Sequence, residues 1–78
     1  MRVPADLSFW QKETSFVERE ATLERPMGAF KPYARMQANF CFGDGFPDLA
    51  NRITRAAGLE EVTPESYRDW YIYISMEE

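Results

Sequence analysis

Residues 33–42 read YARMQANFCF, and the fold class depends on how this stretch is interpreted. Apolar and polar side chains alternate along it with a period of two, which is typical of a β-strand with one face in the core. The apolar positions are Ala34, Met36, Ala38, Phe40 and Phe42. Tyr33 and Arg35 then lie on the opposite, polar face. The pattern predicts a strand over residues 33–42.

The end of the chain shows the same alternation in the stretch WYIYISM, residues 70–76. Trp70, Ile72 and Ile74 would face the core, and Tyr71 and Tyr73 would point the other way. Aromatic and β-branched residues are enriched in strands. We therefore expect a second strand here.

Residues 47–57 carry the signals of a helix at both ends. Pro47 suits the first helical position, and Asp48 in the first turn favours the positive end of the helix dipole. Gly58 stands where a left-handed C-terminal cap is expected. After it, Thr63-Pro64-Glu65-Ser66 predicts another helix start, with only one or two turns before the last strand.

Residues 9–24 admit two interpretations. Trp10, Thr14, Val17 and Ala21 fall on one face of a helix that ends before Pro26. Residues 14–24 also alternate as a strand, and a third strand makes a sheet viable in water where two do not. We adopt the strand.

The expected architecture is then a single small α+β domain spanning residues 1–78, with β-β-α-β order. A small antiparallel sheet of about three strands carries the main helix on one face. The expected core consists of Ala34, Met36, Ala38, Phe40, Phe42, Leu49, Ile53, Trp70, Ile72 and Ile74.

The composition excludes most catalytic and metal sites. The chain has no histidine and one cysteine, which removes zinc fingers, disulfide scaffolds and histidine acid/base chemistry. Cys41 has no base to activate it and is expected to be structural, and Asp44 and Asp48 fit a turn and a helix start better than a calcium loop. We expect no catalytic, metal-binding or cofactor-binding residue and no enzymatic activity.

The sequence shows no signal peptide and no apolar run of about 20 residues. We therefore expect a cytoplasmic protein without a membrane partner.

The charge is concentrated in the second half of the chain. Residues 40–78 hold three basic and eight acidic residues and carry a net charge of −5, whereas residues 1–39 carry +1, which together give the net charge of −4. A solvated acidic face is the simplest interpretation. The same face can also steer a partner or imitate nucleic-acid phosphates on a basic groove. The acidic candidates are Glu60, Glu61, Glu65 and Asp69.

The polar face of the predicted sheet is the second candidate surface, because tyrosine and arginine are enriched at protein interfaces. Its candidate partner-binding residues are Tyr33, Arg35, Tyr71 and Tyr73. Packing of these tyrosines within the fold, or at a homodimer interface, is the competing interpretation.

In size and acidity the chain resembles the small phage-encoded anti-CRISPR inhibitors. The resemblance implies a non-enzymatic protein that binds and inhibits or modulates a larger machine, such as a nucleic-acid-handling complex. The alternative function is a single-stranded nucleic-acid-binding module that stacks bases on the exposed tyrosines and contacts phosphates with arginines. Direct nucleic-acid binding is disfavoured because the net charge is negative.

Overall fold

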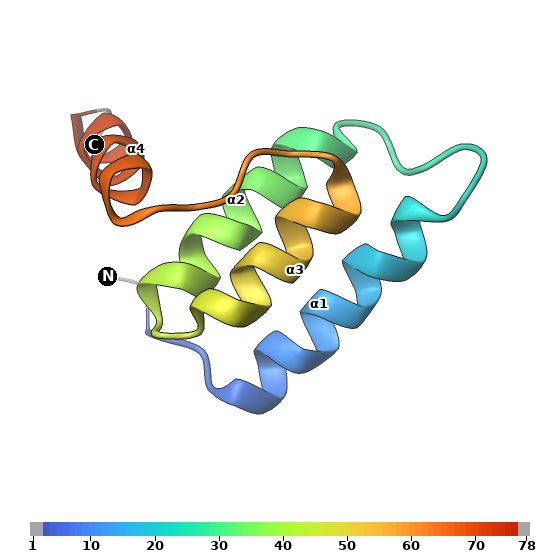
Figure 1. Ribbon diagram of the computed structural model, residues 1–78, viewed down its shortest axis with the longest axis horizontal. Helices are drawn as coiled ribbons and strands as arrows, with labels where there is room; N and C mark the ends of the chain where they lie inside the picture. The colour runs from blue at the N-terminus through green and yellow to red at the C-terminus, as the bar shows by residue number, and fades with distance from the viewer. Residues whose placement is uncertain (1–2, 77–78) are drawn as a thin grey trace.

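The computed structural model of this protein describes residues 3–76, and it consists of helices (Figure 1). The helices are α1 (Leu7–Ala21), α2 (Phe30–Gly43), α3 (Pro47–Ala57) and α4 (Pro64–Met76). No strand forms within residues 3–76. The expected α+β fold with an antiparallel sheet is therefore wrong: the predicted strands at 14–24, 33–42 and 70–76 fall largely or wholly in α1, α2 and α4.

Three of the helices form a bundle with α3 in the middle. α3 packs against both α1 and α2, and α2 runs antiparallel to the other two (Figure 1). The side chains with the least exposure fill the space between them and include Trp10, Val17, Ala34, Ala38, Cys41, Ala50 and Ile53. Val62, which lies just before α4, is also buried in this core.

The helix α2 replaces the strand predicted at residues 33–42. Its buried positions include Phe30, Ala34, Ala38 and Cys41, which follow a helical spacing of four, four and three residues. Ala34 and Ala38 are four residues apart, a spacing that fits both a strand and a helix. The alternation of apolar residues alone therefore could not distinguish a strand from a helix. Met36, expected in the core, is 41% exposed. Residues 34–38 are alanine, arginine, methionine, glutamine and alanine, all of them strong helix formers, and they favour the helix over the strand.

The helical interpretation of the N-terminal third is confirmed, and the strand preferred for it is wrong. Trp10, Thr14 and Val17 are all buried on one face of α1. Asp6 caps the N-terminus of this helix, because its carboxylate accepts a hydrogen bond from the backbone N–H of Phe9 at 2.9 Å.

The helix predicted at 47–57 is confirmed. Pro47 occupies its first turn, Asp48 lies beside it, and Gly58 caps the C-terminus with a φ of 69°. The Leu59 N–H then folds back to donate to the carbonyl of Thr54 at 2.8 Å.

The start of α4 was predicted correctly, but its length was not. Thr63 and Ser66 cap it reciprocally: each backbone N–H donates to the other residue's hydroxyl oxygen, at 2.9 and 3.1 Å. The helix then continues to Met76 instead of giving way to a strand. Within residues 3–76 no strand is present to pair with it, and a helix satisfies its own backbone hydrogen bonds.

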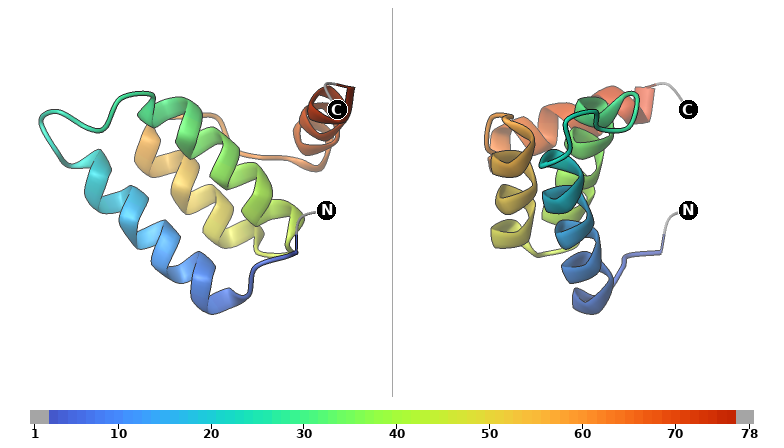
Figure 2. Two further views of the ribbon diagram at one scale, coloured as in Figure 1. Left: turned by 180° about the vertical axis from the view of Figure 1, so that it is seen from behind. Right: turned by 90° about the vertical axis from the view of Figure 1, so that its right-hand side faces the viewer.

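α4 lies beyond α2, on the side away from α1 (Figures 1 and 2). It packs on α2 and contributes no buried residue. Ile72, expected in the core, is 50% exposed, while Trp70 and Ile74 are half-buried. Among the described helices, none is long and apolar enough to cross a membrane.

Candidate protein-interaction surface

Aromatic rings hold the inner side of α4 against α2. The ring of Trp70 meets that of Phe40 edge to face, with 5.0 Å between centroids, and the ring of Tyr67 lies 5.5 Å from that of Phe42. Gly43, in the last turn of α2, makes room for this contact. A Cβ atom at position 43 would lie 2.8 Å from Cζ of Tyr67, closer than real side chains approach.

The side of α4 turned away from α2 is open to solvent. Residues spaced by four, three and four positions share one face of a helix. On α4 this spacing joins Glu65, Asp69, Ile72 and Met76, and each of them is exposed. We call these four residues and the neighbouring Tyr73, which is 63% exposed, the outer α4 face.

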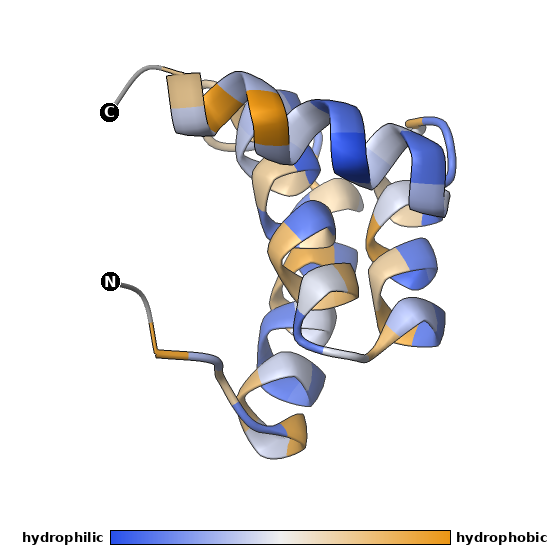
Figure 3. Cartoon of the chain, turned by 90° about the vertical axis from the view of Figure 1, so that its left-hand side faces the viewer, coloured by the Kyte–Doolittle hydropathy of each residue, from blue (hydrophilic) through white to orange (hydrophobic). Residues whose placement is uncertain are grey.

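The outer α4 face changes character along the helix. Its first two turns carry the carboxylates of Glu65 and Asp69, and its last two turns carry the apolar side chains of Ile72 and Met76. Figure 3 shows this division as hydrophilic colouring in the N-terminal part of α4 and hydrophobic colouring in the C-terminal part. One helix therefore presents an acidic end and an apolar end to solvent.

The structure does not bring Tyr33 and Arg35 together with Tyr71 and Tyr73 on one face. Tyr33 turns toward α1, where its hydroxyl donates to the carboxylate of Glu13. Burial and this hydrogen bond raise the pKa of Tyr33 to about 12. In a helix, residues 33 and 35 point about 200° apart, so the shared face that a strand would give them is lost. Tyr73 remains on the outer α4 face, whereas Tyr71 lies one turn after Tyr67 and its ring is 6.1 Å from the ring of Tyr67.

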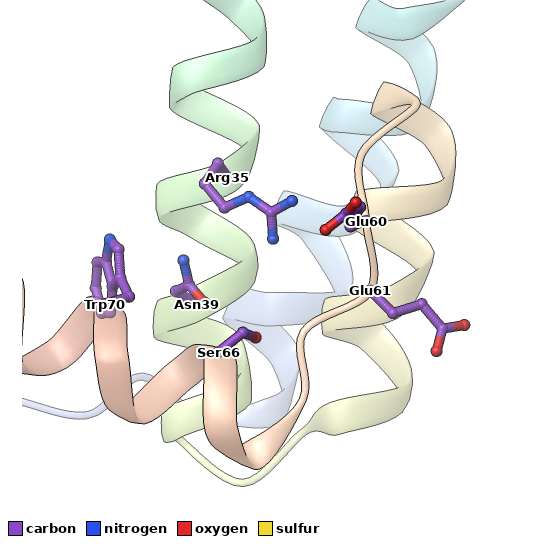
Figure 4. Close-up of a pocket in the computed structure, with 6 residues that line it drawn as sticks. All are labelled: Arg35, Asn39, Glu60, Glu61, Ser66 and Trp70. Carbon is purple, nitrogen blue, oxygen red and sulfur yellow. The ribbon is translucent and has the colours of Figure 1, made fainter.

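Arg35 instead lines a small hollow between α2, the 58–63 connection and α4. The hollow has a volume of about 180 Å³. In Figure 4 the guanidinium of Arg35 and the carboxylate of Glu60 point toward one another, whereas Glu61 turns outward. The ion pairs formed within residues 3–76 are Arg52–Glu18 and Arg68–Asp69. The hollow is smaller than the roughly 300 Å³ at which ligand pockets usually begin, so it suits one side chain of a partner better than a substrate.

The four acidic candidates lie in the connection before α4 and in the first two turns of α4. Glu60 and Glu61 lie in the connection that leads to it, and Glu65 and Asp69 lie on the helix, all of them exposed. Glu65 and Asp69 therefore lie on the same helix as Tyr71 and Tyr73, which sequence reasoning had assigned to a separate surface.

The remaining chemistry-bearing residues are used within the fold. Burial, and then the negative charge of Asp44, raise the pKa of Cys41 to about 12, so its thiol is neutral and unreactive. Asp44 accepts hydrogen bonds from the backbone N–H of Ala5 and the indole N–H of Trp10. Within residues 3–76 no group of three or more Cys, Asp or Glu side chains is placed to hold a metal ion.

Sequence reasoning missed Ile72 and Met76 as surface residues. The signal that could have found them is the helical spacing of Glu65, Asp69, Ile72 and Met76 downstream of the Thr63 cap.

Comparison of the chain with protein-family models, curated proteins and solved structures finds no match.

Proposed function

We propose that this chain is a small non-enzymatic protein-binding module that presents α4 to its partner. One observation carries the proposal: α4 is a 13-residue helix with no buried side chain. Helices of this length are marginal in water and are normally stabilised by burying an apolar face. Here Tyr71, Ile72, Tyr73 and Met76 are between 50 and 81% exposed.

Exposed apolar groups gathered on one element are typical of interaction sites. Aromatic residues, methionine and arginine are enriched in protein interfaces, where a partner excludes water from them. A partner that covers the outer α4 face would supply the burial that the bundle does not. Inhibition or modulation of a larger machine by surface occupancy is the mode of action that we attach to this binding.

Nucleic-acid binding is the weaker alternative. Tyr71 and Tyr73 are exposed enough to stack on bases, but the charged neighbours that line the same helix are mainly carboxylates. Binding of single strands depends on neutralising phosphates, and Arg68 is the one basic residue between positions 59 and 76.

The proposal also places the protein in the cytoplasm, where a lone thiol such as Cys41 stays reduced.

The test compares two aspartate substitutions at equally exposed apolar positions. Ile72→Asp places a charge in the apolar part of the outer α4 face, and Leu23→Asp places the same charge in the loop after α1, where Leu23 is 51% exposed. Each tagged protein is used to capture partners from cells that express the chain, with quantitative mass spectrometry as the readout.

We expect the wild type and Leu23→Asp to retain the same specific partner, and Ile72→Asp to lose it. Circular dichroism must show equal helix content in the three proteins. If Ile72→Asp captures the partner as well as Leu23→Asp does, α4 is not the binding element. Tight binding of labelled single-stranded oligonucleotides that weakens steeply with salt would favour the alternative function.

A further inference from the structure

We propose that the outer α4 face fits an apolar groove whose one end is lined by basic side chains. This inference rests on the proposed function and names the chemistry of the partner. Glu65 and Asp69 would meet the basic end of the groove, and Ile72 and Met76 would enter its apolar part.

The acidic and the apolar side chains occupy successive parts of the helix, and they adjoin at Asp69 and Ile72, about 4.5 Å apart along the axis. With a rise of 1.5 Å per residue, Glu65 and Met76 are separated by about 16 Å along the helix axis. Among residues 3–76, Asp69 forms its ion pair with Arg68, at 3.9 Å, and the two side chains are 76 and 69% exposed. Exposed pairs of this kind are weak, so the carboxylate is free to exchange this contact for one with a partner.

A partner groove would receive a preformed helix. The reciprocal Thr63–Ser66 cap fixes the start of α4, and the contacts of Tyr67 and Trp70 with α2 fix its inner side. Helix-in-groove recognition uses anchors at the spacing found here, and a helix that is already ordered loses little conformational entropy on binding.

A second copy of the chain fits this face less well. Parallel pairing of two α4 helices would place Glu65 and Asp69 against the same carboxylates. Antiparallel pairing through the last two turns separates the acids, but it covers mainly Ile72, Tyr73 and Met76 on each copy. A stable interface needs about 800 Å² and 20–30 residues from each side. Two copies with a net charge of −4 also repel one another.

The partner is identified first by photo-crosslinking in cells that express the chain. Tyr73→benzoylphenylalanine carries the reactive ring on the outer α4 face. Phe16→benzoylphenylalanine is the control, because Phe16 is an exposed aromatic residue on α1. We expect an adduct with one protein from position 73 that position 16 does not give.

Affinity for the purified partner is then measured at 50 and 500 mM salt. The double variant Glu65→Gln/Asp69→Gln removes both charges from the face, and Glu24→Gln/Asp48→Asn removes two exposed charges elsewhere. We expect the first to bind about five- to tenfold more weakly than the second at 50 mM salt, and the difference to shrink at 500 mM because salt screens exposed charges. Ile72→Ala should weaken binding about tenfold or more at both salt concentrations.

The outcomes separate this inference from the proposed function. If no adduct is specific to position 73, both fail. If the adduct is with a second copy of the chain, or if the two double variants bind the partner equally at 50 mM salt, the basic-ended groove is wrong, whereas α4 remains the binding element.

Discussion

Asp44 connects the N-terminal segment to the corner between α2 and α3 through two hydrogen bonds. Its Oδ2 accepts from the backbone N–H of Ala5 at 3.0 Å and from Nε1–H of Trp10 at 2.8 Å. Trp10 is only 1% exposed, so Asp44→Ala leaves a buried donor without this acceptor. We expect the free energy of unfolding to fall by at least about 1–3 kcal/mol.

Urea unfolding followed by circular dichroism measures this loss. Asp48→Ala is the matched control, because Asp48 contributes mainly through the dipole at the start of α3, worth about 0.3–1 kcal/mol. Equal losses in the two variants would contradict the role given to Asp44.

The buried thiol of Cys41 and the half-buried phenol of Tyr33 make stability depend on alkaline pH. The pKa of Cys41 rises from 9.0 to about 12 in the folded protein, mainly by burial, and that of Tyr33 rises from 10.0 to about 12. The folded state therefore holds both protons more tightly than the unfolded state. The stabilisation is fully present below pH 9 and is lost as the pH rises toward 12, by up to about 1.4 kcal/mol per pH unit for each group.

Urea midpoints at pH 7, 9 and 10.5 test this dependence. Cys41→Ala should reduce the decrease between pH 9 and 10, and Tyr33→Phe should reduce the decrease above pH 10. A wild-type midpoint that stays constant to pH 10.5 would contradict the burial of the thiol.

Among the elements, α3 could be predicted from sequence because its signals are local. Proline at the start, aspartate in the first turn and glycine in a left-handed cap each act within one turn of the helix. α2 and the end of α4 could not be predicted in this way. In residues 33–42 the buried positions Ala34 and Ala38 fit both the strand and the helix period. In residues 70–76 the side chains favour a strand, but they continue a helix that is already capped at Thr63.

The candidate surface was predictable in composition but not in arrangement. Tyr71, Tyr73 and the four acidic residues were assigned to the surface, and all are exposed. Ile72 was assigned to the core because strand neighbours point to opposite faces, whereas helix neighbours differ by about 100°. Tyr33 was assigned to the same surface as Arg35 because alternate residues of a strand share a face. In the helix the two residues point about 200° apart, and Tyr33 faces α1.

The attachment of α4 to α2 depends on the missing side chain at position 43. Gly43→Ala would force the ring of Tyr67 away, while alanine suits the helical backbone of α2 better than glycine does. We expect amide hydrogens of residues 64–76 to exchange about tenfold faster or more, with little change in α1 and α3. Gly28→Ala is the control, because a Cβ there meets nothing within 4 Å. Unchanged exchange in α4 of Gly43→Ala would show that this contact does not hold the helix.

At the scale of the whole molecule, the balance between charge and exposed apolar surface sets the tendency to associate. The protein carries a net charge of −4 at pH 7, and its isoelectric point is about 4.8. As the pH falls toward 4.8, carboxylates bind protons and repulsion between copies decreases, while the apolar end of the outer α4 face is unchanged. We expect sedimentation to give the 9.1 kDa monomer at pH 7 and a larger average mass near pH 4.8.

Association near the isoelectric point can arise from α4 or from the loss of net charge alone, and two variants separate these causes. Ile72→Asp and Leu23→Asp change the net charge equally and replace apolar side chains of similar exposure, 50 and 51%. If the outer α4 face drives association, Ile72→Asp should stay monomeric near pH 4.8, and Leu23→Asp should associate as the wild type does. Equal behaviour of the two variants would mean that charge neutralisation is sufficient and that the exposed apolar end of α4 does not direct contacts between copies.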